Sequence, residues 1–218
     1  MGSVTVGKNL MTTTWANLQI GVPSNNYVVT VSVASSSQLL LSATGTDAGS
    51  ASLTFKLSQG SNYTPQFWIY GIGSPGQANL TIAAKGYATL TETVTIDPSG
   101  FVFNNQNFST TTTSIATTLY IQPAALDPEY LTQVAVEQLR PGMTNTKVTV
   151  TLTDQPSQGS GASKAGKITV NPVVFNGADN PNEQITSFEA IGVGQTLLQL
   201  TSPGFSNSAS EVTATVTQ

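Results

Sequence analysis

The fold is decided by the stretch Gly76-Gln77-Ala78-Asn79-Leu80-Thr81-Ile82, followed by Gly86-Tyr87 and Glu92-Thr93-Val94-Thr95-Ile96. The chain repeats this arrangement as Gly194-Gln195-Thr196-Leu197-Leu198-Gln199-Leu200, followed by Gly204-Phe205 and Glu211-Val212-Thr213-Ala214-Thr215-Val216. In both places, apolar and polar residues alternate, which predicts strands. The Gly-aromatic pair predicts the turn that joins the two strands into a hairpin. The sequence therefore predicts two copies of one β module.

The rest of the chain also favours strands. Short β-prone segments are separated by turn signals such as Pro23-Ser24-Asn25-Asn26 and Gln59-Gly60-Ser61-Asn62. No window places apolar residues at the spacing of an amphipathic helix among good helix formers. Short strands with turn signals every 8 to 12 residues or so are typical of antiparallel sandwiches. We therefore expect an all-β protein made of two tandem immunoglobulin-like (Ig-like) antiparallel β-sandwich domains.

Asp97-Pro98-Ser99-Gly100 is the expected boundary, which gives domains at residues 1–97 and 98–218. Phe101-Val102-Phe103 after it echoes Val4-Thr5-Val6 near the start of the chain. A linker of about four residues that contains proline should keep the two modules close and roughly end to end.

The second copy is the longer one. Asn9 and Asn107 match at an offset of 98, whereas Gly76 and Gly194 match at an offset of 118, so about 20 residues are added. The addition falls between Leu119 and Lys147. We expect it to form one extra strand, Thr132 to Leu139, which an Arg-Pro-Gly turn closes. The first copy is thus expected to be a shorter sandwich.

Several motifs of the second copy carry a family resemblance. They are Asp-Pro-Ser-Gly-Phe-Val from Asp97, Asn-Phe-Ser-Thr-Thr-Thr-Thr from Asn107, Leu-Arg-Pro-Gly from Leu139, Ile-Thr-Val-Asn-Pro-Val-Val-Phe from Ile168 and Ser-Pro-Gly-Phe-Ser from Ser202. Together with a C-terminal Val-Thr-Ala-Thr-Val, they resemble the tandem bacterial Ig-like repeats of large secreted or cell-surface proteins. The resemblance covers Phe101 to Gln218, and Val4 to Ile96 in shortened form. It implies an Ig-like fold and an extracellular structural role, and it carries over no catalytic residue.

Composition excludes several classes of function. Charged residues make up 8% of the 218 residues and the net charge is −4, so the chain has no basic stripe for nucleic acid. The second module carries this charge, with four basic against eight acidic residues, while three of each cancel in the first. No apolar run approaches the length that spans a bilayer, so no membrane insertion is expected. Without cysteine or histidine, neither disulfides nor thiolate or imidazole chemistry is available.

The aromatic strand Gln66 to Tyr70 holds the first candidate ligand site. Trp68 and Tyr70 share one face of this strand, while Phe67 and Ile69 share the other, because side chains alternate. If the face of Trp68 and Tyr70 points outward, it can serve as a flat platform for a sugar ring. The alternative is that these rings supply core or interface area.

The densest cluster of oxygen-bearing side chains is the candidate metal site. It comprises Asp179, Asn182 and Glu183, in a loop around Pro181. Calcium prefers six to eight oxygen ligands, and this loop offers two carboxylates without the DxDxDG spacing. A solvated loop is the alternative. No cofactor is expected, and no catalytic residues are expected because no acid pair or serine lies in a recognisable catalytic context.

We expect a non-catalytic extracellular structural or spacer module, with adhesion as an additional role. The alternatives are a sandwich that binds a carbohydrate or a protein, and a subunit of a self-assembling filament or surface layer. The expected partners are neighbouring Ig-like repeats of the same chain, other copies of the protein, a glycan or a surface protein. Met1-Gly2-Ser3 leads directly into Val4 without a signal-peptide pattern. We therefore expect a fragment of an extracellular or cell-surface protein that lacks its targeting signal.

Overall fold

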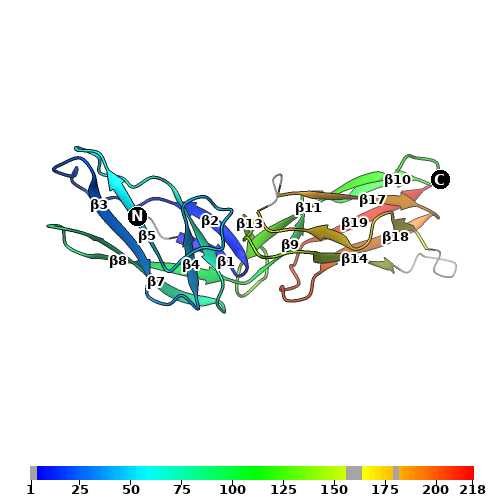
Figure 1. Cartoon of the computed structure of the whole chain (residues 1–218). Helices are drawn as coiled ribbons and strands as arrows, with labels where there is room; N and C mark the ends of the chain where they lie inside the picture. Colours follow the sequence, from blue (N-terminus) through cyan, green and yellow to red (C-terminus); the bar gives the residue numbers. More distant parts are fainter. Residues whose placement is uncertain (1–3, 156–163, 179–181) are drawn as a thin grey trace.

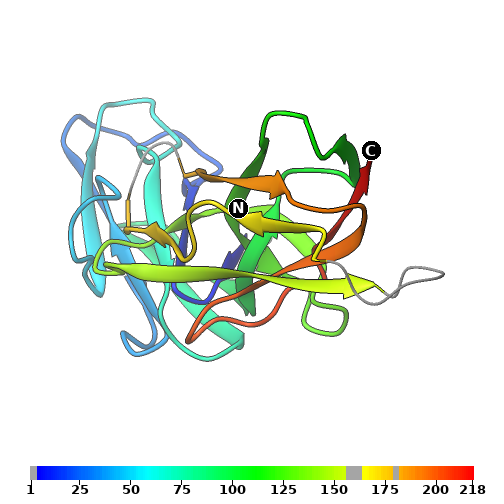
Figure 2. The same ribbon diagram turned by 90° about the vertical axis from the view of Figure 1, so that its right-hand side faces the viewer.

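The structure is a computed structural model that describes residues 4–155, 164–178 and 182–218. These residues form strands joined by turns and loops, in two halves that lie end to end (Figure 1). Figure 2 looks along the long axis from the end that carries the C-terminus, and it shows the two halves displaced sideways from one another. The prediction of an all-β protein with two tandem Ig-like sandwiches is confirmed.

The first sandwich consists of two facing sheets. One sheet has the order β1-β8-β7-β3-β5 and the other contains β2-β6-β4. All pairs are antiparallel except β1 with β8, the first and last strands of the sandwich. The strands are β1 (Val4–Gly7), β2 (Leu10–Thr14), β3 (Tyr27–Val33), β4 (Leu39–Ser42), β5 (Ser52–Leu57), β6 (Phe67–Gly71), β7 (Gly76–Ala84) and β8 (Leu90–Asp97).

The second sandwich repeats this arrangement strand for strand. Its sheets have the orders β10-β19-β18-β14-β16 and β11-β17-β15, and the pairing of β10 with β19 is again parallel. Two further strands, β9 and β12, pair with β11. The strands are β9 (Ser99–Phe103), β10 (Phe108–Thr111), β11 (Thr117–Leu126), β12 (Gln133–Val136), β13 (Gln138–Leu139), β14 (Thr146–Gln155), β15 (Gly166–Ile168), β16 (Val173–Phe175), β17 (Gln184–Ala190), β18 (Gly194–Thr201) and β19 (Glu211–Thr217).

The repeated stretch forms the same hairpin in each half. β7 pairs with β8 from Gly76 opposite Ile96, and β18 pairs with β19 from Gly194 opposite Val216. Gly76 and Gly194 have φ angles of 149° and 157°, a backbone conformation that glycine adopts more readily than residues with a Cβ. The duplication predicted from these residues is therefore a duplication of structure.

The predicted match between the two N-terminal segments is wrong by one strand. β1 runs parallel to β8 as β10 runs parallel to β19, so Val4–Gly7 corresponds to Phe108–Thr111 and not to Phe101-Val102-Phe103. The segment that contains these three residues, β9, instead lies along the edge of β11. A three-residue echo of apolar residues fits either strand, because both alternate in the same way. Within the described residues, the first half has no strand of its own that corresponds to β9.

The added segment Thr132 to Leu139 also differs from the single predicted strand. It forms β12 and β13, which are separated by Glu137. β12 pairs with β11 of its own sandwich, whereas β13 pairs with β2 of the first sandwich. Pro172 lies in the segment between β15 and β16, which belong to different sheets. Proline interrupts a ladder because it has no N–H to donate.

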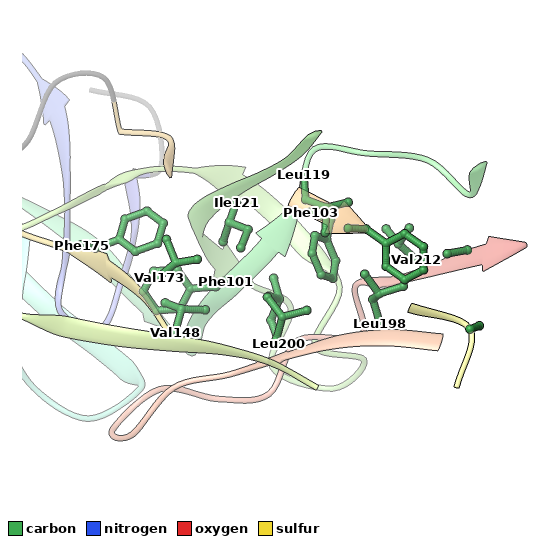
Figure 3. Close-up of a cluster of buried hydrophobic side chains, with 14 of the residues drawn as sticks. Phe101, Phe103, Leu119, Ile121, Val148, Val173, Phe175, Leu198, Leu200 and Val212 are labelled. Carbon is green, nitrogen blue, oxygen red and sulfur yellow. The ribbon is translucent and has the colours of Figure 1, made fainter. Parts of the chain in front are cut away.

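Each half has its own hydrophobic core. The first is built around Val29, Val31, Ile69, Leu80 and Val94. The second lies between its two sheets, as Figure 3 shows. It contains Phe101, Phe103, Leu119, Ile121, Val148, Val150, Val173, Phe175, Phe188, Leu198, Leu200 and Val212. Phe101 packs against both Phe175 and Phe205. Leu10 of β2 is fully buried and belongs to this second core, although it lies in the first half of the sequence.

Candidate functional site: the junction between the two sandwiches

The two sandwiches are joined without a free linker. β8 ends at Asp97 and β9 begins at Ser99, which leaves Pro98 between them. The Pro98 carbonyl accepts a hydrogen bond of 2.8 Å from the amide of Leu126. The linker expected over Asp97 to Gly100 is therefore largely part of the strands, and it has little freedom to act as a hinge.

A strand of the second sandwich extends a sheet of the first. β13 lies along β2, with Gln138 opposite Met11 and Leu139 opposite Leu10, and the other edge of β2 pairs with β6. The amide of Arg140 continues the ladder with a bond of 3.1 Å to the Asn9 carbonyl. In the second sandwich β9 occupies the corresponding edge of β11. The added segment, through β13, therefore extends the sheet of β2 in the first sandwich in the same way as β9 extends the sheet of β11 in the second.

The turn between β1 and β2 inserts into this junction. Asn9 has a φ of 63°, a left-handed conformation that asparagine tolerates better than most residues. Its amide donates to the Gly71 carbonyl at 2.6 Å, while the Lys8 carbonyl accepts from the Ser99 hydroxyl. The turn directs Leu10 into the second core. Burying a leucine side chain contributes roughly 1.5–3 kcal/mol, so this residue fastens the two halves through apolar contact as well.

Close backbone packing at the junction requires glycine at Gly7. A Cβ on Gly7 would lie 2.6 Å from Leu10 Cδ1 and 3.2 Å from the Ser99 side chain. At Gly71, a Cβ would lie 2.6 Å from the Gly7 carbonyl oxygen. These distances are shorter than ordinary van der Waals contact, so the junction is packed as tightly as a protein interior.

The junction buries a carboxyl group. Glu137, which separates β12 from β13, is 8% exposed, and its Oε2 accepts a hydrogen bond of 2.7 Å from the Gly7 amide of the first sandwich. Its backbone is held by Pro123, whose carbonyl accepts from the Glu137 amide at 3.1 Å, and by the Asn182 side chain, which donates to its carbonyl. Glu137 therefore connects three segments of the chain.

Burial changes the ionisation of this group. Desolvation raises the pKa of Glu137 to about 8, and the nearby Asp97 carboxyl adds to the rise, while the Gly7 amide opposes it. The pKa of Asp97 is itself raised, by burial and by Asp127. Burial also lowers the pKa of Arg140, which directly follows β13. No lysine or arginine among the described residues forms an ion pair with Glu137, so at neutral pH this group is mostly the uncharged acid.

The predicted ligand-binding pair lies elsewhere, on β6 in the first sandwich. Phe67 and Ile69, which share one face of this strand, point into the core. The other face is covered: Tyr70 is 1% exposed and its hydroxyl donates to the Asp47 carbonyl at 3.2 Å. Trp68 is half-buried beside Gly45, where a Cβ would lie 2.5 Å from the indole ring. The loop around Asp47 thus packs against both rings, while Trp68 keeps part of its surface accessible to solvent.

The predicted metal-binding residues are only partly within the described structure. Asp179 lies outside the described residues. Asn182 holds the Glu137 carbonyl, and Glu183 accepts from Gln122 Nε2 at 2.6 Å and Asn104 Nδ2 at 3.3 Å. Both side chains thus bind neighbouring protein groups. No group of three or more acidic, histidine or cysteine side chains that could hold a metal occurs in residues 4–155, 164–178 and 182–218.

Sequence reasoning missed Glu137 and Leu10 as junction residues. Both lie in segments that look like ordinary strands. One signal was present: Glu137 interrupts the apolar pattern of an added segment that has no counterpart in the first copy.

Within the described part of the chain, no helix has the length and apolar character needed to cross a membrane.

Comparison with known proteins gives structural matches only. No protein family model and no curated protein matches the chain. Among solved structures, the D0-D1 domain of intimin matches with 16% identity and a TM-score of 0.32, over 98% of this chain and 92% of that one. The S-layer protein SbsC, domains 5-6, matches with 12% identity and a TM-score of 0.32, over 100% and 95%. Invasin, described as a bacterial integrin-binding protein, matches with 15% identity and a TM-score of 0.35, over 95% of this chain and 39% of that chain. Since these scores are low, the Ig-like assignment rests on the strand order and the two cores described above.

Proposed function

We propose that this chain is a non-catalytic spacer of an extracellular or cell-surface protein, in which two Ig-like domains, residues 1–97 and 98–218, act as one stiff segment. The observation that carries this proposal is the exchange at the junction. β13 of the second domain extends a sheet of the first, and Leu10 of the first domain lies in the core of the second.

The physical argument concerns bending. Independent domains on a flexible linker change their relative orientation freely, because few contacts oppose the motion. Here bending must break the β13–β2 ladder and withdraw Leu10 from an apolar core. Each of these steps costs free energy, so the two domains move as one body. A stiff segment holds whatever lies beyond it at a fixed distance from its anchor.

Composition supports an extracellular location. Charged residues make up only 8% of the chain, and threonine and serine take many of the polar positions. The partners that fit this role are neighbouring repeats of the same chain.

Small-angle scattering tests the spacer proposal. The expected result is a monomeric, elongated particle whose profile fits a single rigid arrangement at all protein concentrations. A profile that requires an ensemble of bent and extended particles would refute the proposal.

A second candidate function is self-assembly through a sheet edge. β12 is an edge strand that is exposed at all four residues, with Val134 and Val136 on the same exposed face. Exposed apolar edges are templates for pairing with another chain. If this edge is used, light scattering should rise above a threshold protein concentration, and Val134→Lys should remove that rise. Scattering proportional to concentration would exclude this function.

A further inference from the structure

Two exposed aromatic side chains lie together on the surface of the first sandwich, away from the junction. Trp15, directly after β2, is 53% exposed, and Tyr63 is 49% exposed. With Thr64 and Gln66 they line a shallow hollow of about 430 Å³ that is wide open to solvent. Tryptophan is usually buried to a large extent, so an exposed tryptophan beside an exposed tyrosine calls for an explanation.

The backbone fixes the two rings on one face. Asn17 and Tyr63 form an antiparallel bridge, and the Thr64 amide donates to the Ala16 carbonyl at 3.0 Å. Because side chains alternate along paired segments, Trp15 and Tyr63 share the outer face and are diagonal neighbours across the pair. Ala16 and Thr64 point inward and are buried.

A buried hydrogen bond holds this arrangement in place. The Ala16 amide donates to Thr64 Oγ1 at 2.9 Å, in a position where water does not reach the hydroxyl. At the margin of the hollow, the Gln66 side chain donates from Nε2 to Thr13 Oγ1 at 2.9 Å. This bond orients the amide and leaves Oε1 as an acceptor for a ligand hydroxyl. The rings therefore stand on a supported surface rather than on a loose loop.

The chemistry of the lining selects the ligand. None of the four lining residues carries a charge, so the hollow offers nothing to a phosphate, a sulfate or a metal ion. Aromatic faces pack against the C–H faces of sugar rings, while the amide and hydroxyl groups exchange hydrogen bonds with sugar hydroxyls. A stable protein partner needs roughly 800 Å² on each side, which four residues do not supply.

We propose that Trp15 and Tyr63 form a binding platform for neutral oligosaccharides. This site is separate from the spacer role, which holds whether or not a glycan binds. It also differs from Trp68 and Tyr70, which pack against the loop around Asp47. The same kind of ligand that the sequence suggested is thus assigned to a different pair of residues.

Tryptophan fluorescence tests the site, because the chain contains only Trp15 and Trp68. The protein is titrated with soluble oligosaccharides of β-1,4-linked glucose, β-1,4-linked N-acetylglucosamine, α-1,4-linked glucose and mannose, up to about 10 mM, where a Kd of 1 mM gives near saturation. We expect one class to change the emission of Trp15. The variant Trp68→Phe leaves Trp15 as the only reporter, and the change should persist there.

Substitutions then separate a binding role from a structural one. Trp15→Ala and Tyr63→Ala should each weaken binding at least tenfold by calorimetry, while Tyr63→Phe, which keeps the ring, should stay within about threefold. Tyr130→Ala, at an exposed tyrosine of the second sandwich, is the matched control and should leave binding unchanged. Thermal unfolding shows whether each variant is folded, and a Tyr63→Ala variant that folds suffices if Trp15→Ala does not. The proposal fails if no oligosaccharide binds, if binding survives both alanine substitutions, or if the site proves to capture a protein instead.

Discussion

Replacing Glu137 with glutamine tests the buried carboxyl at the junction. The amide oxygen of glutamine can accept the Gly7 hydrogen bond of 2.7 Å, but the side chain cannot ionise. The pKa of Glu137 is about 8 in the folded chain, against an ordinary value of 4.5. The folded chain therefore holds this proton more tightly than the unfolded chain does. By linkage, the stability that the protonated group contributes is fully present below pH 4.5 and is lost as the pH rises toward 8.

The magnitude follows from the two pKa values. Each pH unit between them lowers the free energy of unfolding of the unmodified chain by about 1.4 kcal/mol. The decrease is about 3 kcal/mol at pH 7 and roughly 4 to 5 kcal/mol above pH 8. Relative to the unmodified chain, Glu137→Gln should thus be about equally stable at pH 4 and about 3 kcal/mol more stable at pH 7. Its stability should also vary less between pH 5 and 9. Asp97, which acts on the Glu137 carboxyl, and Asp127, which acts on Asp97, are present in both proteins.

The assay is urea unfolding followed by circular dichroism at pH 4, 5, 7 and 9. Glu129→Gln is the matched control, because Glu129 is exposed and close in sequence, and it should change the free energy of unfolding by less than about 0.5 kcal/mol at any of these values. The reasoning is refuted if Glu137→Gln is no more stable than the unmodified chain at pH 7, or if both proteins show the same pH dependence.

Three further substitutions test other contacts. Leu10→Ala should lower the free energy of unfolding of the second sandwich by about 2–5 kcal/mol, because it leaves a cavity in that core, and urea denaturation with no loss would contradict the placement of Leu10. Gly45→Ala should cost about 1–3 kcal/mol and shift the Trp68 emission, because φ is 76° and the new Cβ would meet the indole; an unchanged spectrum and midpoint would count against this packing. Thr64→Val should cost about 1–3 kcal/mol in thermal or urea unfolding by leaving the Ala16 amide unpaired, whereas Thr64→Ser should cost less.

The sequence predicts the repeated parts of the fold well. Alternation and turn residues locate the β7–β8 and β18–β19 hairpins, because a half-buried strand imposes a period of two on its own residues. The predicted match of β1 with Phe101-Val102-Phe103 was wrong because a short apolar triplet fits several strands equally well. The sheet to which a strand belongs depends on long-range pairing, which local residues do not encode.

The sites were harder to predict for the same reason. Trp68 and Tyr70 stand out in sequence, yet a loop more than 20 residues earlier packs against them. Trp15 and Tyr63 are 48 residues apart and meet only through a backbone bridge near them. Glu137 looks like a surface acid until β13 is paired with β2 of the other sandwich. Each of these outcomes depends on tertiary contacts between distant segments.

The central claim is that the two sandwiches form one rigid body, and a distance distribution between them tests it most directly. The chain has no cysteine, so Thr54→Cys on β5 and Thr153→Cys on β14 provide unique, exposed labelling sites, one in each sandwich. Spin labels at these positions, measured by pulsed electron paramagnetic resonance, should give one narrow distance distribution, with a width set by the labels alone. The same labels on Leu10→Ala should give a broader distribution. A broad or multimodal distribution in the otherwise unmodified chain would contradict the rigid junction.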